Sequence, residues 1–397
     1  MQDATPAFTL TLHPSIHEIP AAEWDACAGP DNPFVSFAFL SAVEDSGSAG
    51  SRTGWLPQHA ALRDPSGRLL ACAPMYAKSH SYGEYVFDHG WAAAFERAGG
   101  DYYPKLQVAS PFSPVTGPRL LLRPDCGTPP EALRLALAQA LTQACRQLDL
   151  SSVHATFCTE AEWAALGEAG WLARVGTQFH WENAGYADFD GFLGALSSRK
   201  RKTLRRERRD AQGCGLEFLT LRGPEIEPAH WAAFFRFYHS TVDRKWGNAY
   251  LTKRFFPMLG ERLGERVVLM LATQGGTPVA GALNLQGRDA LYGRNWGASG
   301  EWPFLHFELC YYRAIDYAIE HGLSRVEAGA QGEHKIQRGY RPRPTYSAHW
   351  IAHRGLRRAV GEFLDAERPA RVAEMAELDL LSPYRRDGED ATESKKG

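Results

Sequence analysis

Residues 290–330 read ALYGRNWGASGEWPFLHFELCYYRAIDYAIEHGLSRVEAGA. A strand pattern covers 290–296, a helix pattern follows Pro303, and a second strand pattern covers 325–330. Apolar residues recur every three or four positions of the helix pattern, which predicts a helix face packed on a sheet. They are Leu305, Leu309, Tyr312, Ile315 and Ile319, and the predicted helix stop is Gly322. The stretch therefore predicts a strand, a covering helix and a further strand.

The same order of elements extends upstream and is written twice along the chain. In the second half, strand patterns over 267–273 and 278–285 are bounded by the turns QGGT and QGRD. In the first half, two short strand patterns flank the turn DPSG, a helix pattern begins at Pro130, and a strand pattern over 151–157 follows. Each half therefore predicts a mixed sheet with helices against it, and the predicted fold class is α/β (α+β).

Length and composition limit the class of protein. A chain of 397 residues predicts two domains of ordinary size, and 44% hydrophobic with 23% charged residues is a globular composition. The net charge of -2 argues against a chain that coats nucleic acid or an anionic membrane with its whole surface. No stretch approaches the roughly 18 apolar residues of a membrane span, and the first residues lack the pattern of a secretory signal. We therefore expect a cytoplasmic protein.

The cysteines and histidines do not predict a metal centre. The seven cysteines are odd in number and include no C-x-x-C, which favours reduced thiols over disulfides or a zinc site. Two H-x-x-x-H pairs occur, His13 with His17 and His349 with His353. The first pair contains a proline, and the second lies in a strand-like stretch where such residues are well separated. We expect no metal and no tightly bound cofactor.

Five long segments resemble a known family over nearly the whole chain. They are SYGEYVFDHGWA (81–92), FYHSTVDRKWGNAYLT (237–252), LYGRNWGA (291–298), LHFELCYYRAIDYAIEHG (305–322) and EAGAQGEHKIQRGYRP (327–342). The sequence resembles the bacterial FemAB-like family, also described as GNAT-family N-acetyltransferases and as peptidoglycan biosynthesis or recognition proteins. This resemblance implies a tandem duplicated GNAT (acyl-CoA N-acyltransferase) fold related to the Fem-type aminoacyltransferases, which move amino acids from charged transfer RNA.

Domain boundaries follow from an interruption of the apolar pattern. Gly, Asn and Asp break the pattern over 183–190. We predict an N-terminal GNAT-like domain over 1–185, a C-terminal GNAT-like domain with the active site over 186–375, and a polar tail over 376–397.

A strongly basic run, RKRKTLRRERR, occupies residues 199–209. It holds eight Lys or Arg and one Glu, a charge of +7, so the remaining chain carries -9. The run predicts a helix that starts near Ser197 or Ser198. It could bind phosphates of coenzyme A, of a transfer RNA or of a pyrophosphoryl lipid, or it could be a solvated helix face. The predicted phosphate-binding residues are Arg199, Lys200, Arg201, Lys202 and Arg205.

The loop after the strand at 290–296 is the second place where phosphate could bind. The GNAT resemblance places a pyrophosphate loop, [QR]-x-x-G-x-[GA], at this position, and RNWGASG matches it except that Ser299 replaces the last small residue. Amide groups at a helix N-terminus suit such an anion. We slightly favour the alternative that Gly297 and Gly300 only form the turn between strand and helix.

Polar residues gather after the strand pattern that ends near 330. Open α/β sheets bind ligands at such strand ends. The ionisable residues there are Glu333, His334, Lys335, Arg338 and Arg341. The Fem-type resemblance aligns Lys335 and Gly339 with the family's FK-x-x-FG motif. A salt-bridged surface loop is the alternative.

Acyl transfer to an amine needs a base, donors for the oxyanion and two aligned substrates. The alternatives for the base are Glu308, Glu327, Glu333, His306 and His334. We favour Glu333 or His334, with Glu308 as a further catalytic candidate. An inward Glu308 would indicate a site, and an outward one would stabilise the helix N-terminus.

The predicted substrate-binding residues surround these candidates. They are Tyr292, Arg294, Trp296, His306, Gln331, Lys335 and Arg338. Because Tyr292, Arg294 and Trp296 alternate along one predicted strand, we expect them on one face of the sheet. Core packing with a polar tip is the alternative for the Tyr and the Trp.

The function that we predict is N-acyl transfer. An acyl or aminoacyl group would move from acyl-CoA or aminoacyl-tRNA to a small-molecule or peptide amine, with a peptidoglycan precursor as one candidate. The alternative is a non-catalytic protein that recognises cell-wall precursors. A nucleic-acid binder acting through 199–209 is weaker, because the rest of the chain is acidic. The oligomeric state is left open.

Overall fold

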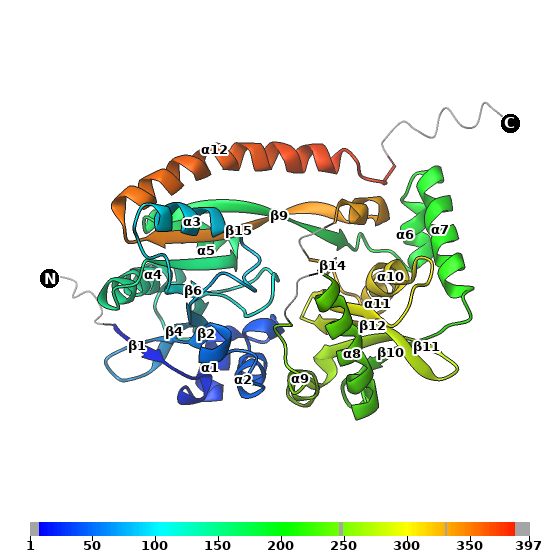
Figure 1. Ribbon diagram of the computed structural model, residues 1–397, viewed down its shortest axis with the longest axis horizontal. Helices are drawn as coiled ribbons and strands as arrows, with labels where there is room; N and C mark the ends of the chain where they lie inside the picture. The colour runs from blue at the N-terminus through cyan, green and yellow to red at the C-terminus, as the bar shows by residue number, and fades with distance from the viewer. Residues whose placement is uncertain (1–7, 246–248, 330–331, 386–397) are drawn as a thin grey trace. The chain divides into compact units, whose positions relative to one another are not determined.

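The computed structural model describes residues 8–245, 249–329 and 332–385 (Figure 1). The chain forms two compact units. The first draws on Met1–Gly176, Ala249–Gly264 and Pro344–Arg371, and the second on Thr177–Asn248, Glu265–Arg343 and Val372–Gly397. The units are therefore not two consecutive halves, and the predicted domain boundaries remain a prediction.

The first unit contains two sheets. The smaller one has the strand order β1-β3-β4-β7, and all its pairs are antiparallel. The larger one runs β2-β5-β6-β8-β15, and only β6 and β8 are parallel. The bounds are β1 (Thr9–His13), β2 (Trp55–Pro57), β3 (His59–Arg63), β4 (Leu69–Ala73), β5 (Met75–Lys78), β6 (Lys105–Val108), β7 (Leu121–Leu122), β8 (Ser152–Cys158) and β15 (Arg341–Ile351).

The main helix of this unit is α4, and it begins at Pro130 as predicted. Its apolar positions Leu133, Leu137 and Leu141 are buried, because they repeat at helical spacing and face the sheet. The helices are α1 (Ala21–Ala28), α2 (Phe37–Asp45), α3 (His89–Arg97), α4 (Pro130–Gln147), α5 (Glu160–Glu168), α9 (Phe255–Leu263) and α12 (Arg354–Asp379), with 3₁₀ turns at Ile16–Glu18, Pro33–Val35 and Ser51–Thr53.

The second unit is built on one sheet with the order β10-β11-β12-β13-β14-β9. Strands β13 and β14 are parallel, and the neighbouring pairs are antiparallel. The strands are β9 (Leu172–Glu182), β10 (Glu217–Arg222), β11 (Val267–Gln274), β12 (Thr277–Gln286), β13 (Ala290–Ala298) and β14 (Arg325–Glu327). The helices are α6 (Phe189–Gly194), α7 (Ser198–Gln212), α8 (Pro228–Lys245), α10 (Leu305–Phe307) and α11 (Arg313–Glu320), with 3₁₀ turns at Gly223–Glu225, Gly264–Arg266 and Glu333–Arg338.

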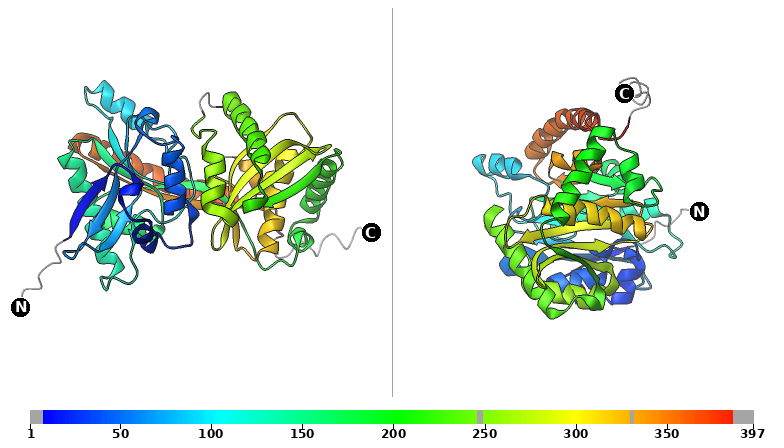
Figure 2. Two further views of the ribbon diagram at one scale, coloured as in Figure 1. Left: turned by 90° about the horizontal axis from the view of Figure 1, so that it is seen from below. Right: turned by 90° about the vertical axis from the view of Figure 1, so that its right-hand side faces the viewer.

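Helices cover both faces of this sheet. Helix α8 packs on β12 and β13, while α11 joins the core formed by the other face (Figure 2). The predicted helix over 304–322 is found over 305–320, but its middle part, Glu308–Tyr312, is a π-helical turn. Single π turns often occur at functional sites. The predicted apolar face is confirmed, since Leu305, Leu309 and Ile315 are buried.

The C-terminal part of the second unit extends into the region predicted as a polar tail. The division between the units falls within α12, after Arg371, so residues 376–379 of this helix belong to the second unit. Arg341 pairs with Asp379, with Nε 2.8 Å from Oδ1. The hydroxyl of Tyr384 donates to the carbonyl oxygen of Gly339 at 2.9 Å. The tail prediction for 386–397 lies outside the described residues. Among the helices that the structure describes, none has the length and apolar character needed to cross a membrane.

Candidate active site

The parallel pair β13 and β14 lies at the centre of the predicted site. Ala290, Leu291 and Tyr292 pair with Arg325, Val326 and Glu327, and the pairing stops there. Strand β13 continues to Ala298, whereas β14 ends at Glu327. The pairing therefore ends at a strand end of the kind where open α/β sheets bind ligands.

A β-bulge at Arg294 changes which side chains share a face. Asn284 of β12 pairs with Gly293 and Leu283 pairs with Asn295, so Arg294 is an extra residue in β13. An inserted residue shifts the alternation of side chains by one position. Tyr292 therefore shares a face with its partner Leu285, and Trp296 lies on the opposite face with Ala282. The prediction that Tyr292 and Trp296 project to one face is wrong.

Aromatic rings and histidines meet on the face that carries Trp296. The ring of His306 lies 5.1 Å from the ring of Trp296 and 6.2 Å from that of His334. The hydroxyl of Tyr311 lies 2.9 Å from Nε2 of His334 and forms a hydrogen bond with it. We call Trp296, His306, Phe307, Tyr311 and His334 the aromatic–histidine cluster. It brings together three residues predicted from different segments.

Lys335 is buried next to this cluster. Its ammonium group donates to the carbonyl oxygens of Ala328 at 2.7 Å and Gly329 at 3.0 Å, just beyond the end of β14. Burial lowers the pKa of Lys335 to about 8. The ammonium group therefore holds the backbone at the strand end, and the predicted contact with an anionic substrate group remains a prediction.

Arg338 forms a buried ion pair with the basic helix. Its Nη2 lies 2.9 and 3.0 Å from the carboxylate oxygens of Glu207 in α7, and its guanidinium lies 3.3 Å from the centre of the Phe307 ring. Tyr312 also donates to Glu207. The charge of Arg338 is thus balanced by the carboxylate of Glu207, which weakens its attraction for an anionic group of a substrate.

Glu308 points inward and is enclosed by two arginines. It is 0% exposed and lies 3.4 Å from both Arg208 and Arg313. Gln212 donates to it at 3.0 Å. Burial raises the pKa of this carboxyl, and the arginines oppose the effect. These contacts favour a structural role in joining α7 to the π turn over the predicted catalytic role.

The predicted basic helix is confirmed, and it has two distinct faces. It starts at Ser198 after the N-cap Ser197 and buries Leu204, Glu207 and Ala211. Arg199, Lys202 and Arg205 are exposed, and Arg205 pairs with Asp190 at 2.8 Å. Arg201 is half-buried, and Lys200 donates to the side chain of Gln337 in the 3₁₀ turn Glu333–Arg338. Helix α7 therefore contacts the turn that carries His334 and Lys335.

The FemAB-like family, described as peptidoglycan biosynthesis/recognition, matches residues 15–386. The chain belongs to the FemAB-like family. Among curated proteins, no sequence matches it.

Solved structures show the fold of this FemAB-like protein. The C-terminal domain of a protein described as a lysylphosphatidylglycerol synthetase from Agrobacterium fabrum aligns with a TM-score of 0.55 and 10% identity, covering 89% of this chain and 97% of that one. FemX aligns with a TM-score of 0.54 and 11% identity, covering 89% and 100%. A conserved protein of unknown function from Bacteroides thetaiotaomicron aligns at 0.50 and 11%, covering 86% and 99%.

At these identities the likeness concerns the fold. The predicted tandem GNAT-type α/β fold is confirmed. The family description covers both biosynthesis and recognition, and the fold and the family agree with the predicted acyltransferase class.

Some predicted residues do not join the aromatic–histidine cluster of the FemAB-like chain. Glu333 is exposed, and Gln331 lies outside the described residues. Gly297 belongs to β13 and not to a turn. A Cβ at this position would lie 2.1 Å from the carbonyl oxygen of Phe237 in α8. The amide of Ser299 donates to Val279 at 2.8 Å, so it is not directed at a phosphate. Gly297 therefore permits close helix packing.

A row of polar side chains shares the face of Tyr292, and sequence reasoning missed two of its members, Arg325 and His180. Glu327 pairs with both Tyr292 and His180 across three strands. Arg325 donates from Nε to Glu327 at 2.9 Å, and Nε2 of His180 lies 3.8 Å from the same carboxylate. His180 sits in a strand far away in sequence, so no local pattern could reveal it. Glu207 and Tyr311 were missed too, although a single acid within a run of eight cations was a usable signal.

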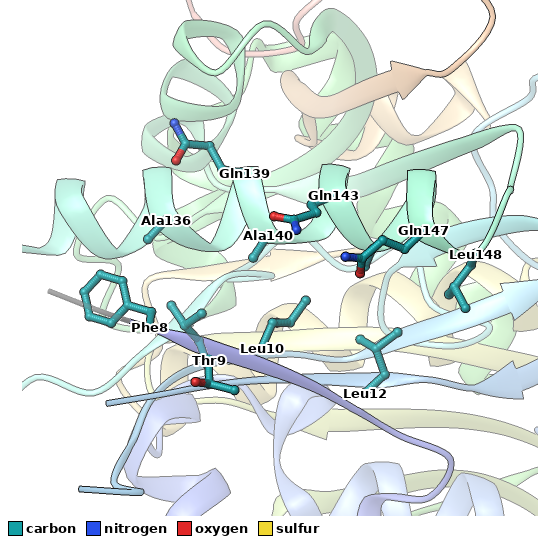
Figure 3. Close-up of a pocket in the computed structure, with 12 residues that line it drawn as sticks. Phe8, Thr9, Leu10, Leu12, Ala136, Gln139, Ala140, Gln143, Gln147 and Leu148 are labelled. Carbon is teal, nitrogen blue, oxygen red and sulfur yellow. The ribbon is translucent and has the colours of Figure 1, made fainter. Parts of the chain in front are cut away.

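Two further observations concern ligands. Within residues 8–245, 249–329 and 332–385, no group of three or more His, Cys, Asp or Glu could hold a metal ion. A groove of about 520 Å³ lies between β1 and α4 of the first unit (Figure 3). Leu10 and Leu12 form its apolar floor, and Gln143 and Gln147 form its rim. It contains none of the predicted site residues.

Proposed function

We propose that this FemAB-like enzyme transfers an acyl or aminoacyl group to an amine in its second unit. The observation that carries the proposal is the contact between α7 and the 3₁₀ turn Glu333–Arg338. Glu207 holds Arg338 and Lys200 reaches Gln337, so a basic surface adjoins His334 and Lys335. A donor that carries phosphates could be held by α7 while its acyl group lies near the aromatic–histidine cluster.

The reaction assigns a role to His334. The amine nitrogen attacks the carbonyl carbon of a thioester or ester, the amide bond forms, and the bond to sulfur or oxygen breaks. The acceptor ammonium first loses one proton to become the attacking amine. Its nitrogen loses a second proton as the amide forms, and the released thiolate or alkoxide gains one. His334 is exposed and bonded to Tyr311, which suits a base that also needs orientation. Lys335, with its pKa lowered to about 8 by burial, is the second candidate for proton transfer.

The donor is acyl-CoA or aminoacyl-tRNA, since both carry phosphates. The predicted phosphate contacts, from Arg199, Lys200, Arg201, Lys202 and Arg205, are kept in this proposal. The exposed positions Arg199 and Lys202 lie on the first two turns of α7. Cations at a helix N-terminus are unfavourable next to the helix dipole, and a bound anion would offset this cost.

The acceptor that we propose is an amine of a peptidoglycan precursor, because the family is described by peptidoglycan biosynthesis or recognition. We place the reaction in the cytoplasm. All seven cysteines are free, which is the usual state in a reducing compartment.

A transfer assay on the full-length chain tests the proposal. The protein is incubated with labelled acetyl-CoA or with labelled aminoacyl-tRNA, each with a peptidoglycan precursor as acceptor. We expect label in the acceptor from one donor, and His334→Ala should lower kcat/KM by about 10²–10⁴-fold. His321→Ala is the matched control, since His321 is an exposed histidine just beyond α11.

Two results would count against this function. Binding of the precursor without transfer from either donor would make the chain a recognition protein. Equal activity of the wild type and His334→Ala would remove His334 from the reaction and leave Lys335→Met as the next variant.

A further inference from the structure

The first unit contains two lysines buried opposite each other. Lys78 of β5 pairs directly with Lys105 of β6, and both side chains are 0% exposed. Like charges at such a position repel each other, and buried charges are costly unless they are paired. The sheet therefore needs anionic partners at this point.

The segment 81–88, part of the SYGEYVFDHGWA motif, supplies these partners. Lys105 donates to Ser81 at 2.8 Å, to Glu84 at 2.8 Å and to Asp88 at 2.5 Å. Lys78 lies 3.7 Å from Glu84 and donates to the carbonyl oxygen of Tyr82 at 3.4 Å. Three side chains and one carbonyl of the segment thus contact lysines of the sheet. These contacts fix the conformation of the segment.

The aromatic side chains of the same segment are exposed to solvent. Tyr82 and Phe87 are each 61% exposed, and Tyr85 is 37% exposed. The His89 ring at the start of α3 lies 6.0 Å from the Tyr82 ring and 6.4 Å from the Phe87 ring. We call Tyr82, Tyr85, Phe87 and His89 the aromatic platform. Large exposed rings gathered on one short segment mark an interaction site rather than ordinary surface.

Backbone strain at Tyr85 is an independent sign of function. Its φ is +60°, in the left-handed region that non-glycine residues rarely adopt. Such a conformation is unfavourable and persists where the surroundings impose it, typically at binding sites. The anchoring of Glu84 and Asp88 on either side provides these surroundings. The platform is therefore pre-organised, which reduces the entropy lost on binding.

The chemistry of the platform selects an uncharged ligand with hydroxyl groups. The carboxylates of the segment are directed inward to the lysines, and the platform side chains carry no carboxylate, guanidinium or ammonium group. Aromatic faces suit the C–H faces of sugar rings, and the Tyr hydroxyls and the His ring can exchange hydrogen bonds with sugar hydroxyls. We propose that the aromatic platform of the first unit binds a saccharide.

The saccharide site goes beyond the proposed function, and only the choice of probe rests on the proposed acceptor. The probe is a tetrasaccharide of β-1,4-linked N-acetylglucosamine, titrated into the full-length chain without any donor. Binding is measured by calorimetry and by saturation-transfer NMR. We expect Tyr82→Ala and Phe87→Ala each to weaken binding at least tenfold. Phe363→Ala, at a position that is 49% exposed in α12, should bind as the wild type does.

The outcomes are separable from those of the transfer assay. A wild type that does not bind the tetrasaccharide overturns the proposal, and so do Tyr82→Ala and Phe87→Ala proteins that bind it normally. Binding of an uncharged aromatic peptide in its place would also overturn it. Melting curves of each variant show whether lost binding reflects unfolding, and Tyr82→Phe, which keeps the ring, should retain most of the affinity. A protein that binds the sugar but transfers no acyl group would contradict the proposed function alone.

Discussion

Glu207 of the basic helix and Arg338 of the turn beside Lys335 form a buried ion pair, with Nη2 of Arg338 2.9 and 3.0 Å from the two carboxylate oxygens. Glu207 is 8% exposed and Arg338 is 7% exposed. The only acid in a run of eight cations thus joins that run to the candidate active site.

Removal of this acid should destabilise the protein. Glu207→Ala leaves Arg338 buried without its carboxylate, and we expect the free energy of unfolding to fall by about 3–5 kcal/mol. Urea unfolding measures the change. Asp210→Ala on the same helix is the control, because its partners Arg206 and Arg209 are 69% and 76% exposed. It should cost about 0.5 kcal/mol or less. Equal losses of unfolding free energy in the two variants would contradict a stabilising role of the Glu207–Arg338 pair.

Because of Lys335, the free energy of unfolding should rise with pH. Burial lowers its pKa in the folded state to about 8, against 10.5 for the free side chain. Between these values the unfolded chain binds more protons, so the free energy of unfolding increases with pH. The full effect is about 3 kcal/mol. Unfolding of the wild type and Lys335→Met from pH 7 to 10.5 should show this increase only in the wild type, and Lys253→Met, at an exposed position, should behave as the wild type does.

The packing of Gly297 against α8 can be tested by adding one methyl group. Gly297→Ala would place Cβ 2.1 Å from the carbonyl oxygen of Phe237, and we expect a loss of about 1–3 kcal/mol in the free energy of unfolding. Gly194→Ala in α6 is the control, because nothing lies within 4 Å of a Cβ there. That change should be neutral or stabilising by about 0.5–1 kcal/mol. A stable Gly297→Ala protein would show that α8 can shift away from β13.

The exposed cations of α7 should contribute to binding of a polyanion. We expect Arg199→Gln and Lys202→Gln each to weaken tRNA binding and to reduce the slope of log affinity against log salt by about 0.7–0.9. Filter binding between 50 and 300 mM salt gives the slope. Arg358→Gln, in α12, removes a cation whose side chain is 83% exposed and should leave the slope unchanged. An unchanged slope in the α7 variants would favour acyl-CoA as donor or a purely solvated helix face.

The bulge at Arg294 predicts that Trp296 and Tyr292 affect different parts of the enzyme. Trp296 touches His306 of the aromatic–histidine cluster, so Trp296→Ala should lower kcat/KM by at least tenfold. Tyr292 lies on the other face with Glu327, and Tyr292→Phe should change kcat/KM less than twofold. Steady-state transfer assays on both variants decide the matter. Similar losses would mean that the substrate spans both faces.

Several features could be predicted from the sequence because they depend on neighbours along the chain. The helix from Pro130, the basic helix from Ser198 and the strands of the second half repeat their apolar or charged residues at a regular spacing. Caps and turns mark their ends. The doubled order of elements then indicated the fold class. His306 and His334, both predicted for the site, have ring centres 6.2 Å apart.

Only the tertiary structure determined how these elements are combined. The bulge at Arg294 and the π turn at Glu308–Tyr312 each change the face on which the following side chains lie. No residue type in the sequence predicts either of them. The pairing of Glu308 with arginines from two helices favours a structural role for it. The contact of Glu207 with Arg338 joins residues 131 positions apart, so packing and charge compensation across the fold fix it. Local spacing specifies which elements form, whereas the burial of charges and the fit of side chains between elements specify which residues share a site.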